Sequence, residues 1–186
     1  MAVGDDSEDL QVLARHKIVR ARVAAAAHTD TPAELLAAMA ADTSPKVRRI
    51  VAGRARTPPD SLRLLVADPD AATRKALAAN VSTPTEVLSK LGGDDNFAVR
   101  YAALTNPVAV ADLCVLKALC ASPHRDVRLI LAQQPRLPTE AVTLLVQDPV
   151  GQVREYLAER TDDPAALEIL VNDPKPRVRA GSGTST

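Results

Sequence analysis

Apolar positions in this chain recur as two kinds of short cluster that alternate from end to end. In the segment Asp68 to Asp94 the first cluster has the spacing i, i+3 and i+4, which places its side chains on one face of a helix. It consists of Thr73, Ala76 and Leu77. The second cluster is a leucine pair at i and i+3, Leu88 and Leu91. The segment therefore predicts two short helices joined by a turn.

Polar residues at the ends of these clusters predict where each helix begins and ends. Asp68 followed by Pro69 is typical of a helix N-cap with proline in the first turn. Asn80 then tolerates the left-handed conformation that ends many helices. The sequence Thr-Pro-x-Glu from Thr83 to Glu86 has the spacing of a capping box, which predicts the start of the second helix.

The same segment recurs along the whole chain, with an arginine six residues after the aspartate as its anchor. The anchors are separated by 26, 26, 26, 28, 26 and 25 residues, and they are Arg22, Arg48, Arg74, Arg100, Arg128, Arg154 and Arg179. The aspartate position holds Asp42, Asp68, Asp94, Ser122, Asp148 and Asp173. The apolar pair of the second helix recurs as Leu36/Met39, Leu62/Leu65, Leu88/Leu91, Leu116/Leu119, Val142/Leu145 and Leu167/Leu170. A fixed period of this length predicts an all-α solenoid.

The composition agrees with stacked repeats and excludes several classes of protein. The chain has 186 residues with one Phe, two Tyr and no Trp, and stacked helices can bury Ala, Val and Leu without aromatic residues. The formal net charge is zero, so no global field attracts nucleic acid or an anionic membrane. There is no long apolar run and no signal-peptide pattern. We therefore expect a cytoplasmic protein without membrane contact.

The repeat pattern also predicts the organisation of the chain. We expect a mobile N-terminus at residues 1–6, one solenoid domain at 7–180 with a capping half-unit at 7–16, and a flexible tail at 181–186. Residues 105–112 lack the usual proline and carry two extra residues, which indicates either harmless drift or a place where a partner binds. The last unit is truncated, so the apolar face around Leu167, Leu170 and Val171 is covered by the tail or, alternatively, by a second chain.

These motifs, Asp-Pro-x-x-x-Val-Arg-x-x-x-Ala-x-Asn followed by Thr-Pro-x-Glu-x-Leu-x-x-Leu, resemble those of the leucine-rich repeat variant family over nearly the whole chain. The resemblance implies alternating α and 3₁₀ helices stacked into a right-handed superhelix similar to HEAT and armadillo arrays. Some members of that family carry a cysteine cluster for an iron-sulfur centre. This chain has two cysteines and no such cluster, so the resemblance does not imply an iron-sulfur centre here, and we expect no cofactor.

The anchor arginines form the most regular row of charges. Stacked cations could grip phosphates. With the preceding valine pointing inward, however, each arginine lies about 100° round the helix, on the flank that abuts the next unit. We therefore interpret the row as structural, with a capping aspartate or a helix-end carbonyl as the partner of each arginine.

The exposed row is expected one residue after each anchor. We predict a partner-binding strip there, because exposed aromatic and apolar residues flanked by charge are typical of interface hot spots. The strip consists of Arg49, Lys75, Tyr101, Leu129 and Glu155. Ordinary scatter of residues on a solvated surface explains the same row equally well.

A local basic run is the one signal for nucleic acid. The candidate patch is Lys46, Arg49, Arg54 and Arg56, with no acid between Asp42 and Asp60. No aromatic residue lies nearby in sequence to stack on bases, so the signal is weak.

The remaining residues show no arrangement for catalysis or for metal binding. Cys114 and Cys120 are spaced for neither a disulfide nor a metal site and are interpreted as small buried residues. We find no phosphate loop and no nucleophile motif. The sequence therefore predicts a scaffold that binds a protein partner, without enzymatic activity or cofactor. Nucleic-acid binding and a HEAT-like enzyme are the alternatives.

Overall fold

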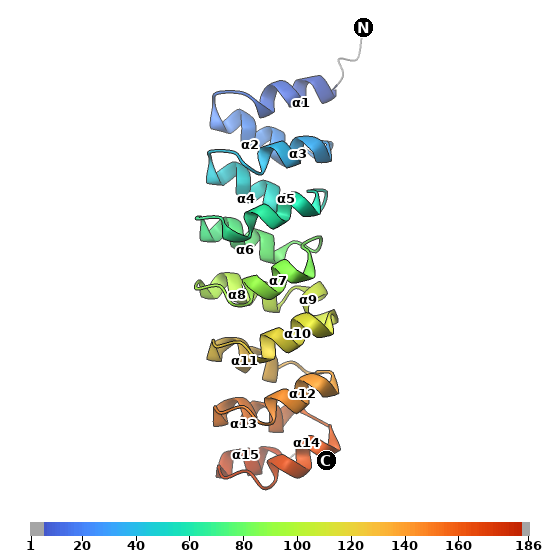
Figure 1. Ribbon diagram of the computed structural model, residues 1–186, viewed down its shortest axis with the longest axis vertical. Helices are drawn as coiled ribbons and strands as arrows, with labels where there is room; N and C mark the ends of the chain where they lie inside the picture. Colours follow the sequence, from blue (N-terminus) through green and yellow to red (C-terminus); the bar gives the residue numbers. More distant parts are fainter. Residues whose placement is uncertain (1–5, 184–186) are drawn as a thin grey trace. The chain divides into compact units, whose positions relative to one another are not determined.

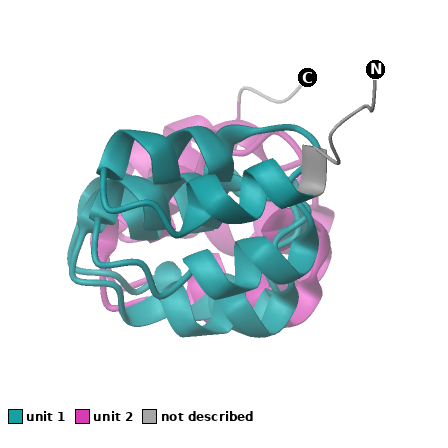
Figure 2. Cartoon of the chain, turned by 90° about the horizontal axis from the view of Figure 1, so that it is seen from above, with its two compact units in different colours: residues 1–108 teal, residues 109–186 magenta. Residues whose placement is uncertain are grey.

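The computed structural model describes residues 6–183, and in this part of the chain it contains helices and no β-strand (Figure 1). The chain divides into two compact units, unit 1 at Met1–Val108 and unit 2 at Ala109–Thr186 (Figure 2). We call the helix that carries the anchor arginine the first helix of a repeat, and the next one the second helix. The predicted all-α repeat fold is confirmed.

Unit 1 begins with a single second helix, α1 (Asp6–Ala14), within the predicted capping half-unit. Its first helices are α2 (Val19–Ala27), α4 (Pro45–Gly53), α6 (Ala71–Ala79) and α8 (Phe97–Leu104). Its other second helices are α3 (Ala33–Met39), α5 (Pro59–Leu64) and α7 (Thr85–Leu91). The first helices pack in sequence, α2 on α4, α4 on α6 and α6 on α8.

Unit 2 repeats this arrangement with fewer helices. Its second helices are α10 (Leu113–Cys120), α12 (Thr139–Leu145) and α14 (Pro164–Leu170), and its first helices are α11 (Arg125–Ala132), α13 (Gly151–Arg160) and α15 (Pro176–Gly181). The first helices again pack in order, α11 on α13 and α13 on α15. The irregular stretch predicted at 105–112 forms a short extra helix, α9 (Pro107–Ala111), where the two units join in sequence.

The core of each unit is built from the positions that the period marks as apolar. All residues of the repeated second-helix pairs are buried except Leu167, which is half-buried. Buried alanines of the first helices, among them Ala26, Ala52 and Ala78, lie between neighbouring repeats, and their small size allows the helices to approach closely. Burying each leucine side chain stabilises the array by about 2 kcal/mol relative to exposure.

The helix starts differ from the sequence-based expectation. Asp70, and not Asp68, is the N-cap of α6, and it accepts a hydrogen bond from the Thr73 N–H at 3.0 Å. Thr83 makes no capping box. Its buried hydroxyl donates instead to the Leu77 carbonyl at the end of α6, at 2.6 Å, and this carbonyl also accepts from the Asn80 N–H at 3.1 Å.

The helix ends also differ from expectation. No described residue has a positive φ, and Asn80 ends α6 in an extended conformation with φ −76° and ψ 123°. The predicted left-handed end is therefore wrong. The alternation of 3₁₀ helices implied by the family resemblance is likewise replaced by short α-helices. In the described residues, 3₁₀ geometry forms a separate element only at Leu65–Ala67.

The two ends of the chain are more helical than predicted. Asp6, assigned to a mobile terminus, begins α1, and Gly181, assigned to a flexible tail, ends α15. The rest of these predicted segments, apart from Ser182 and Gly183, lies outside the described residues. On the last apolar face Leu170 is buried, whereas Val171 is exposed. An oligomer formed through this end stays a prediction, as does the single domain at 7–180.

Candidate functional site

The anchor arginines connect successive first helices within each unit. Five of the seven anchors make a two-pronged bond to the aspartate that precedes the next first helix, with Nε to Oδ2 at 2.6 Å. These pairs are Arg22–Asp42, Arg48–Asp68, Arg74–Asp94, Arg128–Asp148 and Arg154–Asp173. All seven anchors also donate through Nη1 to the carbonyl six residues earlier, as Arg74 does to Asp68 at 2.6 Å. The predicted structural role of the row is confirmed.

The aspartates of this ladder are held in their charged form. The bond from Arg22 lowers the pKa of Asp42 below its ordinary value, and the bond from Arg154 does the same for Asp173. Burial opposes ionisation of Asp68 and Asp94, yet hydrogen bonds from an arginine and from a backbone N–H lower both pKa values. The charge pairs therefore stabilise the stacking of successive first helices.

A second set of side chains ties the repeats of unit 1 together. The Asn80 amide donates to the carbonyls of Ala52 and Arg54 at 2.8 and 2.9 Å, in the repeat before it. Asn106 makes the same two bonds one repeat later, at 2.8 and 3.0 Å. The sequence analysis missed this role, although the recurrence of asparagine at a spacing of 26 residues was its signal. These bonds satisfy carbonyls at helix ends that would otherwise lack a donor.

The candidate basic patch contains two side chains that belong to the same set of ties. Arg54 donates to three carbonyls at the end of α2, those of Ala27, His28 and Thr29, at 2.9 to 3.1 Å. Arg56 bonds the Thr29 carbonyl at 3.3 Å. Arg49 pairs with Asp70 at 3.1 Å, and Lys46 is exposed. Positive charge at the end of a helix is stabilising, so these contacts favour a structural role for Arg54 and Arg56.

The predicted strip is divided between the two units. Arg49, Lys75 and Tyr101 are exposed on α4, α6 and α8 of unit 1. Leu129 and Glu155 lie on α11 and α13 of unit 2, where both are half-buried. The expectation that Leu129 is an exposed apolar residue is therefore wrong. The role of the strip in binding stays a prediction.

An exposed aromatic pair lies at the unit 1 part of this strip. Phe97 is 52% exposed and Tyr101 is 49% exposed, and their ring centroids lie 6.0 Å apart on one face of α8. The Arg100 guanidinium lies 5.8 Å from the Phe97 ring centroid and holds that ring by a cation–π contact. Phe97 was not among the predicted site residues, because its position, three residues before the anchor, holds Val19, Pro45 and Ala71 elsewhere.

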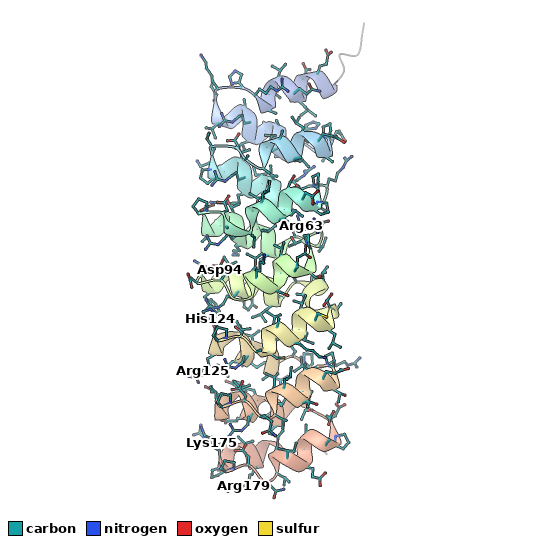
Figure 3. All side chains as sticks on the ribbon, viewed as in Figure 1. Arg63, Asp94, His124, Arg125, Lys175 and Arg179 are labelled. Atoms are coloured by element: carbon teal, nitrogen blue, oxygen red, sulfur yellow. The ribbon has the colours of Figure 1, made fainter. Side chains whose placement is uncertain are left out.

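A hollow of about 940 Å³ lies over α13 in unit 2, and we call it the α13 hollow. Side chains from α11, α13 and from the start of α15 line it. They include Arg125, Gly151, Gln152, Tyr156, Lys175 and Arg177. Glu155, the last residue of the predicted strip, is the acid of the lining. Figure 3 shows Arg125 and Lys175 along the same edge of this unit.

The polar side chains of the α13 hollow contact one another across repeats. The Arg125 guanidinium donates to the Gln152 Oε1, and the Gln152 amide donates to the Tyr156 hydroxyl at 3.4 Å. A Cβ at Gly151 would collide with the Lys175 side chain, so Lys175 lies directly over the start of α13. Two cations, one from α11 and one from the approach to α15, therefore converge on residues 151 and 152.

A second hollow in unit 2 has a volume of about 300 Å³ and lies at the other ends of α11 and α13. Gln134 and Arg160, which occupy the repeat position of Asn80, both line it. Gln134 donates to the Ile130 carbonyl of its own helix at 3.5 Å. Arg160 is exposed and, among the described residues, makes no bond like that of Asn80.

The remaining candidate groups are dispersed. Cys120 is buried, and desolvation raises the pKa of its thiol to about 11, whereas Cys114 is exposed and not buried as predicted. Within residues 6–183, no three His, Cys, Asp or Glu side chains are grouped to hold a metal ion. No helix of the described part has the length and apolar character needed to cross a bilayer.

Two comparisons with known proteins find relatives of this repeat. The family model described as leucine rich repeat variant matches residues 45–70 and 125–150. These segments contain Arg48 with Asp68 and Arg128 with Asp148, which are two rungs of the ladder. A solved structure described as a leucine-rich repeat variant with a novel repetitive protein structural motif is 29% identical, and the match covers 94% of this chain and 69% of that chain with a TM-score of 0.63. No curated protein matches the sequence.

Proposed function

Because the chain belongs to the leucine-rich repeat variant family, we propose that it is a non-catalytic scaffold that binds a protein partner through the exposed face of its first helices. The aromatic pair on α8 carries this proposal. Phe97 and Tyr101 are two of the three aromatic residues in the chain, and both are about half exposed. Exposed aromatic rings are enriched at the centres of protein interfaces.

The stacking of unit 1 supports the same function. Bonds of 2.6 Å between Arg48 and Asp68 and between Arg74 and Asp94 connect the first helices behind the exposed face. The cation–π contact with Arg100 further limits the motion of the Phe97 ring. A face that is already ordered loses little conformational entropy when a partner binds, so a modest apolar contact can give useful affinity.

The surroundings of the pair indicate the chemistry of the partner. Lys75 on α6 and Arg49 on α4 are exposed at the positions equivalent to Tyr101. Arg49 already has Asp70 as a partner, so Lys75 contributes the nearest uncommitted positive charge of the strip. The face therefore suits a partner with an apolar side chain for the rings and an acidic group beside it.

The test removes the rings and leaves the rest of the face intact. Phe97→Ser/Tyr101→Ser is compared with the control Leu64→Ser/Val81→Ser, which removes two exposed apolar residues elsewhere in unit 1. Proteins retained on each immobilised variant are identified by mass spectrometry. We expect one set of proteins to be retained by the native chain and by the control, and to be lost from the aromatic variant. If all three retain the same proteins, the α8 face is not the binding face.

The nucleic-acid alternative is tested separately with the basic patch. Arg54 and Arg56 bond carbonyls of the preceding repeat, and Arg49 pairs with Asp70, so Lys46 is the exposed cation of the patch that bonds no other side chain or carbonyl in the described residues. We expect no shift of single- or double-stranded DNA by the native protein at low salt. A shift that weakens in the Lys46→Gln variant would favour the alternative.

A further inference from the structure

We propose that the α13 hollow of unit 2 binds an acidic, extended peptide segment, whose carboxylates lie between Arg125 and Lys175. This site is distinct from the aromatic pair of unit 1, and nothing in the proposed function depends on it. Three observations carry the inference: an excess of positive charge, a glycine that opens the hollow, and the size and lining of the space.

Positive charge exceeds negative charge in the lining of the α13 hollow, which contains three cations and one carboxylate, that of Glu155. Arg125, Lys175 and Arg177 all line it, and within residues 6–183 none of them forms an ion pair. The arginines of the ladder, by contrast, are paired at 2.6 Å, as Arg154 is with Asp173 in the same unit. Like charges that converge are mutually destabilising, and an anion between them relieves the repulsion.

Gly151 shapes the space between these cations. The equivalent position in the other repeats holds Val19, Pro45, Ala71, Phe97, Arg125 and Pro176, each with a side chain. At Gly151 any Cβ would collide with Lys175, so the missing side chain lets this lysine reach across the start of α13. The Lys175 backbone is fixed by its N–H bond to Asp173 Oδ1 at 2.8 Å. The ammonium is therefore aimed at the hollow from an anchored backbone.

The dimensions fit a peptide segment. A volume of about 940 Å³ exceeds the needs of a single inorganic anion. The hollow spans three successive first helices, α11, α13 and α15. Helix axes about 8–10 Å apart make this span roughly 16–20 Å, which is the length of about five or six extended residues, and the Arg125 and Lys175 side chains meet near its middle, over Gln152 and Gly151.

The lining favours a peptide over a nucleic acid. Val150, Pro176 and the Tyr156 ring provide apolar contact for side chains, while Gln152 offers an amide for a peptide backbone. Glu155 adds a negative charge to the lining. A carboxylate there repels a continuous row of phosphates, whereas an acidic peptide can place a neutral or basic residue beside it.

The test uses the full chain and a fluorescein-labelled ten-residue peptide that carries four glutamates among glycine and serine. Binding is followed by fluorescence polarisation at low salt. We expect saturable binding that weakens with added salt and is absent for the peptide with glutamine at the four positions. Arg125→Gln and Lys175→Gln are each expected to weaken binding about three- to tenfold, as for the loss of one charge-assisted hydrogen bond. Lys117→Gln, an exposed lysine on α10, is the matched control and should leave the affinity unchanged.

Gly151→Ala separates binding from folding. The three atoms nearest to the added methyl all belong to the flexible end of Lys175, so we expect the fold to be kept while the ammonium is displaced. We expect the melting temperature of Gly151→Ala to equal or exceed that of the native chain. Its affinity for the peptide should fall as much as that of Lys175→Gln. Gly53→Ala, whose new methyl would lie 3.9 Å from the Ala76 Cβ, is the control and should bind the peptide like the native chain.

Other results would overturn the proposal. One is a peptide affinity that Lys175→Gln and Gly151→Ala both leave unchanged. A second is tighter binding of a ten-nucleotide single-stranded DNA than of the peptide, if the DNA affinity depends on the same two residues. A third is competition by citrate that displaces the labelled peptide as effectively as unlabelled peptide does. The Phe97→Ser/Tyr101→Ser variant should bind the peptide normally, so failure here and failure of the α8 face are distinguishable.

Discussion

Units 1 and 2 contain the same repeat, yet they differ in what lies between successive first helices. Both have the arginine–aspartate ladder, with pairs such as Arg48–Asp68 in unit 1 and Arg154–Asp173 in unit 2. Unit 1 adds side chains that cross from one repeat to the carbonyls of the one before, as Asn80 does. In unit 2 the equivalent Arg160 lines a hollow of about 300 Å³ instead.

The residue type at this repeat position does not decide the outcome by itself, because Arg54 occupies it in unit 1 and bonds the carbonyls at the end of α2, whereas Arg160 makes no such bond in the described residues. The α11–α13–α15 stack is held by the ladder, by the Arg125–Gln152 bond and by a buried core at Val153, Leu157 and Ala158. The additional ties are therefore not required for stacking. Where they are absent, the chain has surface available for a ligand. The four predictions below test this division of roles, from the largest expected effect to the smallest.

Acid is expected to weaken unit 1 before unit 2. In unit 1 the pKa values of Asp42, Asp68 and Asp94 are lowered, and in unit 2 that of Asp173 is lowered. A carboxylate whose pKa is lower in the folded state adds its full stability above its unfolded pKa, near 3.8, and loses it as the pH falls through the folded value. Hydrogen exchange at pH 6 and at pH 3 should show the greater loss of protection in residues 19–104. Equal loss in both units would contradict this.

Arg48→Ala should destabilise the protein by about 3 kcal/mol, because it leaves the buried Asp68 without its charged partner. Urea unfolding measures the effect. The neighbouring Arg49→Ala removes a more exposed pair with Asp70 and should cost less than about 1 kcal/mol. A similar loss for the two arginines would mean that the ladder does not hold the stack.

Asn80→Ala is expected to cost about 2 kcal/mol, since the carbonyls of Ala52 and Arg54 lose a buried donor. Asn172→Ala is the matched control, because its exposed side chain bonds only the Glu168 carbonyl of its own turn. It should change the free energy of unfolding by less than about 0.5 kcal/mol. If both variants unfold at the same urea concentration, the cross-repeat bonds of unit 1 contribute nothing measurable.

Arg160→Asn should build the missing tie in unit 2. By the spacing seen at Asn80 and Asn106, the new amide would meet the carbonyls of Ala132 and Gln134. We expect a gain of about 1 kcal/mol and slower hydrogen exchange at the end of α13. Arg160→Ala, which removes the arginine without adding an amide, should not give this gain, and an equal gain in both variants would argue against the tie.

Much of the fold was predictable because its core follows a period of 26 residues. The buried pairs, such as Leu88 with Leu91, and the direction of the anchor arginines come from helical spacing alone. The helix starts were predicted less well. Asp68 and Thr83 have the local pattern of caps, yet both bond to other partners, because a charged arginine competes for Asp68 and a carbonyl at the end of α6 competes for Thr83.

The candidate sites were less predictable than the fold. Tyr101 and Glu155 were placed on one strip from their spacing, but Leu129 is half-buried between them in sequence. Gly151 gave no local signal, since its effect depends on Lys175, 24 residues later. Sites of this kind arise from contacts between repeats, and a pattern within one repeat does not contain them.

By itself, the sequence determined the repeat, its helices, the buried faces and the arginine–aspartate ladder, because each follows from a short period that every copy obeys. Only the tertiary structure decided where side chains bridge successive first helices and where a hollow lies between them. That outcome depends on what single residues such as Arg160 and Gly151 meet in the neighbouring repeat, 20 or more positions away in sequence. The physical reason is that contacts between repeats join residues that are distant in sequence, whereas the repeat pattern describes only residues that are close in sequence.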